Sequence, residues 1–205
     1  MKRLTFSVLT AFVLWFLMFS PLTAPRFDFW QTMTGGALLL NALATLFAPA
    51  WWERLRFSRS NLLLGAAIAV ALWCIFWVGD KISGWILPFA RPEVDAIYGI
   101  KEGISPWTLS LLLLLIIGPT EEIFWRGFVQ ERLSRRWGAD RGFLVATALY
   151  TAVHIPSCNF MLIMAAMVAG AVWGLGYRLF PDRFTALVIS HALWDAAVFV
   201  WFPIL

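Results

Sequence analysis

The sequence predicts an all-α, polytopic membrane protein with about seven transmembrane helices, and three observations support this. Of its 205 residues, 61% are hydrophobic and only 14% are charged, whereas a soluble domain carries roughly 25% charged residues. Thirteen Trp and 18 Phe suit a chain whose aromatic side chains anchor at the membrane interfaces. Seven apolar segments come near the roughly 20 residues that a helix needs to cross a bilayer. Disordered, collagen-like and disulfide-scaffold proteins are excluded because their compositions differ from this one.

Each apolar segment is predicted to form one span. The first follows Lys2 and Arg3 and resembles a signal peptide, but it is long for a signal core; we expect an uncleaved helix, with a cleaved signal as the alternative. The fourth is long and contains charges, and the fifth is short. In order, the segments are Leu4–Ser20, Thr32–Ala50, Asn61–Gly79, Trp107–Leu133, Gly142–Ile155, Phe160–Phe180 and Phe184–Phe202. Cys74 and Cys158 are expected to be two separate buried thiols rather than a disulfide.

The basic residues predict how the chain is oriented and divided. With the N-terminus inside, eleven basic residues fall in cytoplasmic segments and four in outer segments, as the positive-inside rule requires. The N-terminus is therefore predicted to be cytoplasmic and the C-terminus to lie outside. The net charge of +4 reflects arginines facing anionic lipid headgroups, so no nucleic-acid partner is expected.

We divide the chain into a three-span region with an outer loop, residues 1–106, and a four-span core, residues 107–205, within one integrated membrane domain. The outer loop, residues 80–106, mixes charged and apolar side chains. Two structures fit this pattern: a plain solvated connector, or a segment that lies partly in the interface and caps a cavity from outside.

Three charged residues lie inside the fourth span and need an explanation, because each charge at the bilayer centre costs roughly 2.5–3.5 kcal/mol. Glu122 and Arg126 are four residues apart, so they share a helix face and can form an ion pair. Glu121 points about 100° away and has no partner on its own helix. Pro119 follows Gly118 and is expected to kink the helix or to restart it there. Such distortion is tolerated at membrane depth where it lines a protein cavity.

The only two histidines of the chain also lie within predicted spans. His154 shares a helix face with Tyr150, and His191 shares one with Asp195. An intramembrane His is often only a satisfied hydrogen bond between helices. Two histidines at a depth similar to Glu121 and Asp195, however, favour convergence on one site. Small residues at every fourth position of the sixth span, including Gly170 and Gly174, would let neighbouring helices approach closely.

Taken together, these motifs resemble the CPBP family, the CAAX-protease and bacteriocin-processing intramembrane proteases, also called the Abi family. The resemblance extends from about residue 109 to residue 202. It rests on Glu-Glu-x-x-x-Arg, aromatic-x-x-x-His and His-x-x-x-Asp in this order, which are Glu121, Glu122, Arg126, Tyr150, His154, His191 and Asp195.

The resemblance implies an endopeptidase in which Glu121 and His154 activate a water and His191 with Asp195 contributes to the oxyanion hole. It also implies that Glu122, Arg126 and Tyr150 support these groups. The last motif often ends in Asn, and here it ends in Asp195. Because an ionised Asp cannot donate a hydrogen bond, we expect Asp195 to orient His191, whose ring N–H would donate. The expected partners are a membrane-anchored peptide or protein substrate and the lipid bilayer.

Other functions stay open at this point. No cofactor is expected, but a zinc peptidase using Glu121, Glu122, His154 and His191 is an alternative, against which the metal-ligand spacing of known zinc peptidases is missing. A proton-coupled transporter is a second alternative, since intramembrane Glu and His are typical of that class. A non-catalytic immunity or scaffold protein with the same fold is a third.

Overall fold

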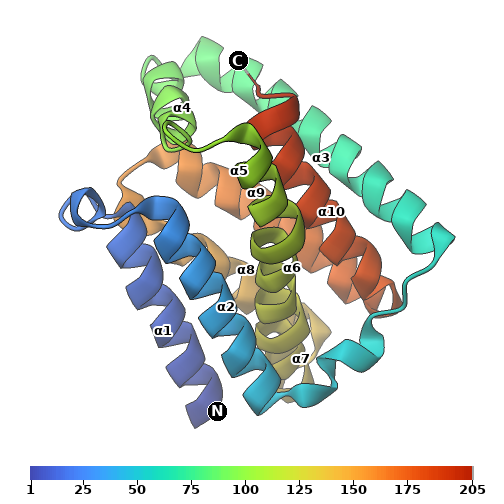
Figure 1. Ribbon diagram of the computed structural model, residues 1–205. Coiled ribbons are helices and arrows are strands. Elements are labelled where there is room, and N and C mark those ends of the chain that lie inside the picture. The colour runs from blue at the N-terminus through green and yellow to red at the C-terminus, as the bar shows by residue number, and fades with distance from the viewer. Residues whose placement is uncertain (205) are drawn as a thin grey trace.

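The protein is an all-α, multi-pass membrane protein. The computed structural model describes residues 1–204, and all their regular elements are helical. Figure 1 shows long helices that run between two ends of a bundle, with the N-terminus and α7 at the lower end and α4 and the C-terminal region at the upper end. Leu205, where the four-span core was expected to finish, lies outside the described residues.

Within residues 1–204, ten α-helices, three π-helical segments and four short 3-10 segments form the spans and their connections. Side-chain capping explains where three of these helices begin. The side chains of Asp28, Ser58 and Asn159 each accept a hydrogen bond from the backbone N–H three residues later. The α-helices are α1 (Lys2–Phe19), α2 (Phe29–Phe47), α3 (Arg59–Ile86), α4 (Ala90–Gly99), α5 (Pro106–Leu112), α6 (Gly118–Glu122), α7 (Glu131–Trp137), α8 (Ala139–Ala152), α9 (Phe160–Leu179) and α10 (Phe184–Ala196). The π segments are Leu113–Ile117, Ile123–Gln130 and Ala197–Trp201.

Five helical stretches are long and apolar enough to cross a membrane, two fewer than the seven spans expected. The second expected span forms α2, but polar residues such as Gln31 and Asn41 dilute its apolar character. The fifth forms α8, which has 14 residues and so reaches only about 21 Å at 1.5 Å per residue. Both helices still pack inside the bundle, beside α1 and α9 respectively. The five stretches are Lys2–Phe19, Arg59–Ile86, Pro106–Trp137, Phe160–Leu179 and Pro181–Trp201.

The segment expected to be an outer loop is mostly helical. Helix α3 continues to Ile86, beyond the expected end at Gly79, and α4 follows it. The side chain of Glu93 on α4 accepts a hydrogen bond from the backbone N–H of Met161 at the start of α9 (2.9 Å). Beyond the other end of α4, Lys101 donates to the carbonyl of Phe199 (2.9 Å). Helix α4 is therefore a fixed lid between α9 and the end of the chain, which excludes the plain-connector reading.

The helix that carries Glu121 is distorted where the sequence predicted, but it does not restart. Ile117 and Gly118 both keep right-handed helical dihedral angles, so residues 106–137 form one continuous helix. Its turns before and after α6 are π-helical. A π turn directly before Pro119 accommodates a residue that has no N–H to donate. Glu121 and Glu122 thus lie between two π segments instead of in a first helical turn.

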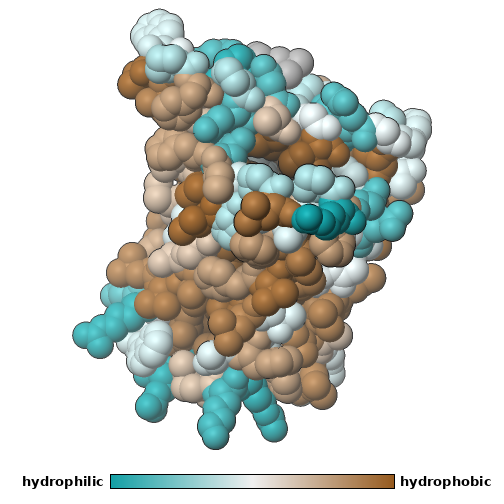
Figure 2. Space-filling view, turned by 90° about the vertical axis from the view of Figure 1, so that its left-hand side faces the viewer, coloured by the Kyte–Doolittle hydropathy of each residue, from teal (hydrophilic) through white to brown (hydrophobic). Residues whose placement is uncertain are grey.

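The surface of the bundle is that of a membrane protein. Figure 2 shows a broad band of hydrophobic residues, with hydrophilic side chains projecting from the lower end. Large apolar side chains, such as Leu9, Leu63 and Leu115, are exposed on the surface of the bundle. Cys74 and Cys158 are free and also exposed, so they form no disulfide, and the expectation that they are buried is wrong.

A close approach between α6 and α10 depends on Gly118. A Cβ atom at this position would lie 2.7 Å from the Cα of Ala192, which is too close for the two backbones to keep their separation. We expect Gly118→Ala to destabilise the protein by about 1–3 kcal/mol through overpacking, measured as a lower Tm in detergent. Gly35→Ala is the matched control, since nothing lies within 4 Å of its added Cβ; an equal loss in both variants would contradict the packing explanation.

Candidate active site

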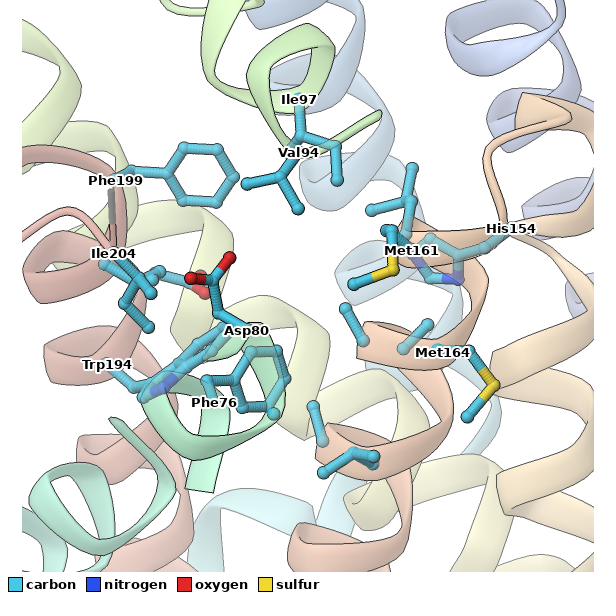
Figure 3. Close-up of a pocket in the computed structure, with 18 of the residues that line it drawn as sticks. Phe76, Asp80, Val94, Ile97, His154, Met161, Met164, Trp194, Phe199 and Ile204 are labelled. Atoms are coloured by element: carbon cyan, nitrogen blue, oxygen red, sulfur yellow. The ribbon is translucent and has the colours of Figure 1, made fainter. Parts of the chain in front are cut away.

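The candidate residues surround one cavity of about 510 Å³. Its walls are almost entirely apolar, and Figure 3 shows Phe76, Trp194 and Phe199 on one side facing Met161 and Met164 on the other. Its polar lining is small and includes Asp80, Ser83 and Tyr98 besides the motif residues. Five of the seven motif residues line it: Glu121, Tyr150, His154, His191 and Asp195. The predicted convergence of the intramembrane polar residues is therefore present in the structure.

Glu121 is held by one neighbour and otherwise faces the cavity. The Tyr150 hydroxyl donates a hydrogen bond to its Oε2 (3.0 Å), and the side chain is 7% exposed. Within residues 1–204, no protein group donates to the other oxygen, Oε1. A buried carboxylate with one free oxygen facing a cavity can accept a hydrogen bond from a water and take its proton.

Glu122 has a different environment, although it is the adjacent residue. The predicted ion pair with Arg126 is present, with 2.9 Å between Arg126 Nη1 and Glu122 Oε1 and almost no exposure of either side chain. The other Arg126 nitrogen, Nη2, donates to the carbonyl of Gly170 (3.1 Å). Glu122 is therefore a structural anchor that joins its own helix to α9 through Arg126.

The glycine face of α9 explains how Arg126 reaches that carbonyl. A Cβ at Gly170 would lie 2.9 Å from the Tyr150 ring on α8, so only glycine allows α8 and α9 to pack this closely. One helical turn further, the carbonyl of Gly174 accepts a hydrogen bond from the side chain of Gln130 (2.8 Å). The small-residue pattern of the sixth span thus provides both the predicted close approach and two backbone acceptors.

His191 is fixed from three directions. Its Nδ1 lies 3.0 Å from Glu122 Oε1, and its Nε2 lies 3.5 Å from Asp195 Oδ2. Its ring stacks on that of Trp173, with 3.8 Å between ring centroids and 14° between planes. The predicted contact with Asp195 is therefore present but long for a hydrogen bond, and Glu122 is the nearer carboxylate. This leaves Nε2 as the ring nitrogen that a substrate oxygen could approach.

His154 lies in the turn after α8, because this helix ends at Ala152 and not at Ile155 as expected. Its Nδ1 contacts the carbonyl of Tyr150 (2.8 Å), which calls for a proton on that nitrogen. Its Nε2 then accepts a hydrogen bond from the indole N–H of Trp15 on α1 (3.1 Å). Both ring nitrogens are occupied by protein, and within residues 1–204 no hydrogen bond joins His154 to Glu121.

Sequence reasoning missed three features of this site. Trp15 comes from α1, and Trp173 comes from α9; both are fully buried, yet among 13 Trp nothing in the local sequence distinguishes them. Ser190 stands beside His191 but accepts from Trp173 Nε1 (3.0 Å) and donates to a backbone carbonyl. It therefore supports Trp173 and is not poised as a nucleophile.

The residues considered for a zinc ion lie near one another but are not arranged as a set of metal ligands. Within residues 1–204, no group of three or more His, Cys, Asp or Glu side chains is arranged to hold a metal. Of the four residues considered, His191 and Glu122 contact each other, Glu121 bonds to Tyr150, and His154 has both nitrogens engaged elsewhere. This donor set does not fit a bound metal ion in the structure.

Comparison with known proteins gives one result. Residues 103–197 match the family model described as type II CAAX prenyl endopeptidase Rce1-like. Neither curated proteins nor solved structures give a match. The matched residues include all the motif positions that line the cavity, whereas Trp15 lies outside them.

Proposed function

Because residues 103–197 belong to the Rce1-like family of type II CAAX prenyl endopeptidases, a CPBP family, we propose that this protein is an intramembrane endopeptidase. It hydrolyses a peptide bond in a membrane-associated protein or peptide, using a water activated by Glu121. The observation that carries this proposal is the apolar cavity that Glu121 lines with one carboxylate oxygen free, together with Tyr150, His154, His191 and Asp195.

In the proposed reaction, Glu121 Oε1 takes a proton from a water that attacks the scissile carbonyl carbon. Tyr150 holds Oε2 and so fixes the orientation of the carboxylate. As the carbonyl oxygen gains negative charge, the Nε2–H of His191 donates to it in place of its long contact with Asp195 (3.5 Å). The proton on Glu121 then passes to the leaving amine, which completes hydrolysis without an external proton source.

The functional test compares membranes from cells that express the wild-type protein with membranes from cells that express Glu121→Gln. Only the wild-type protein should generate new peptide N-termini from membrane-associated proteins. Identical peptide profiles with an intact cellular phenotype would instead favour a non-catalytic scaffold. Loss of transport in Glu121→Gln without any cleaved product would favour a transporter.

We propose that His154 Nε2 helps to hold the attacking water, which requires breaking its hydrogen bond with Trp15. The water must displace the Trp15 N–H from this nitrogen, and breaking a neutral hydrogen bond costs about 0.5–1.5 kcal/mol. We expect Trp15→Phe to remove this cost and to raise kcat/KM about 2- to 10-fold, while His154→Ala lowers kcat. Steady-state kinetics on a cleaved peptide would measure both.

Trp125→Phe is the packing control for Trp15→Phe. Trp125 is also 1% exposed, but among the described residues its indole N–H has no hydrogen-bond partner. Any effect that comes only from the lost indole volume should appear in both variants. A fall in kcat/KM confined to Trp15→Phe would contradict the proposed displacement and would make Trp15 a residue that positions His154.

Activity is expected to survive metal removal. Since no three of the candidate carboxylates and imidazoles within residues 1–204 are arranged around a common metal position, the proposed reaction uses Glu121 directly. Cleavage after exhaustive treatment with a strong chelator should therefore continue at the untreated rate. Loss of cleavage that returns on adding Zn²⁺ would restore the zinc-peptidase alternative.

A further inference from the structure

The cavity is confined to one half of the bundle. It is lined by the second half of α1, the first half of α2 and the second half of α3, with α4 as the lid. The first part of α9 and the second part of α10 complete it. All these segments meet at the upper end of Figure 1, where α4 and the C-terminal region lie. The lining residues reach as far as Trp173, past the middle of α9, and none of them belongs to α7 or to the first half of α1.

The opposite end carries most of the positive charge. Contacts between distant segments show that the basic residues gather there: Arg132 donates to the carbonyl of Phe47, and Arg183 donates to the side chain of Asn61 (3.3 Å). Eleven of the 16 basic residues belong to this end, and four belong to the cavity end. They are Lys2, Arg3, Arg54, Arg56, Arg59, Arg132, Arg135, Arg136, Arg141, Arg178 and Arg183.

These two observations fix the direction from which a substrate reaches Glu121. The positive-inside rule assigns the arginine-rich end to the cytoplasm, and the cavity occupies the other end. Resting on the proposed peptidase function, we propose that the cavity opens to the non-cytoplasmic half of the membrane. Its substrate is then an apolar, membrane-proximal segment of a protein that has already been translocated.

The side walls indicate that this segment enters from the lipid. Ile82 and Ile86 on α3 line the cavity and are 51% and 68% exposed, and Phe160 on α9 lines it and is 45% exposed. Apolar side chains that line the cavity and are also exposed on the outer surface offer an apolar route from lipid, although Asp80 and Ser83 on α3 line the cavity as well. An apolar peptide segment can enter along these side chains, whereas a charged segment would pay the cost of desolvation.

The native cysteine Cys158 provides the first test of the direction of access. It is exposed and lies four residues after His154, at the cavity end. A charged, membrane-impermeant maleimide added to intact cells should label Cys158. For a control at the other end, Arg136→Cys in a Cys74→Ser/Cys158→Ser background should be labelled only after permeabilisation, because Arg136 is exposed at the arginine-rich end.

A second variant places the thiol in the cavity itself. Val94 points into the cavity from the lid, so Val94→Cys in the same background should react with the reagent from outside. Labelling should lower cleavage at least tenfold in right-side-out vesicles. Ala96→Cys, on the exposed face of the same helix, should be labelled equally without loss of cleavage.

Labelling and cleavage separate the two proposals. Labelling of Arg136→Cys but not Cys158 in intact cells would overturn the outward-facing cavity, whether or not the protein cleaves peptides. Outside labelling of Cys158 and Val94→Cys with no cleaved product in any preparation would support the direction of access and would overturn the peptidase. Cleavage unaffected by labelled Val94→Cys would contradict entry through this cavity.

Discussion

Glu121→Gln is expected to abolish peptide cleavage and leave the fold intact. Gln is nearly isosteric with Glu, and its side-chain carbonyl can still accept the Tyr150 hydrogen bond that Oε2 accepts now (3.0 Å). It cannot take a proton from water. Loss of a general base typically lowers the rate by about 10²- to 10⁴-fold, so kcat should fall by at least that factor. Quantification of the cleaved product in detergent-solubilised protein measures the loss.

Glu102→Gln is the matched control for this change. Glu102 is an exposed carboxylate after α4, outside the cavity, so its loss should leave both cleavage and Tm unchanged. The Tm of Glu121→Gln should also stay near the wild-type value. If Glu121→Gln retained more than one tenth of the wild-type kcat with an unchanged Tm, another group would have to activate the water.

Glu122→Ala is expected to lower the free energy of unfolding by about 3–5 kcal/mol. The change removes the carboxylate that faces Arg126 Nη1 at 2.9 Å and His191 Nδ1 at 3.0 Å. It therefore leaves the Arg126 charge buried without its partner, and breaking one side of a buried ion pair typically costs this much. Thermal unfolding in detergent should show a clearly lower Tm, and cleavage should fall because His191 loses its nearer carboxylate.

Two further variants identify the cause of that loss. Asp95→Ala removes one partner of the exposed Arg91–Asp95 ion pair (2.9 Å), and its effect should stay below about 1 kcal/mol. Adding Arg126→Met to Glu122→Ala should recover part of the stability, since the unpaired charge is removed. If the stability losses of the single variants Glu122→Ala and Arg126→Met simply added in the double variant, the two side chains would not be energetically coupled.

The pair of predictions assigns different tasks to two adjacent carboxylates. Glu121 should matter for the reaction and little for stability, and Glu122 should matter for stability first. The sequence already distinguished the two roles, because only Glu122 has a basic residue, Arg126, four residues away on the same helix. The structure adds the reason: Glu121 faces the cavity, whereas Glu122 is fully buried against Arg126 and His191.

Several elements could be predicted because their signals are local. The bounds of α9 agree with the sixth expected span to one residue, since an apolar run ends there at polar and proline residues. A cap over a cavity was one of two readings of residues 80–106, but its helix α4 was not predicted because its ten residues are only weakly apolar. Contacts with α9 and the C-terminal region hold this helix. Helix α8 ends at Ala152, three residues before the predicted end at Ile155. The sequence around His154 contains no signal that predicts this earlier end.

The sequence by itself determined the kind of protein and the residues of interest. The composition established a helical membrane protein. Because charged and polar side chains are costly inside a membrane, Glu121, Glu122, Arg126 and the two histidines stood out as candidates for a functional site. Only the tertiary structure decided which partners they have. Tyr150 bonds to Glu121, Trp15 caps His154, and Glu122 is the nearer carboxylate to His191. These pairings depend on how each helix is rotated and how deeply it lies in the bundle. Close contacts between helices, such as that of Gly118 with Ala192, determine both.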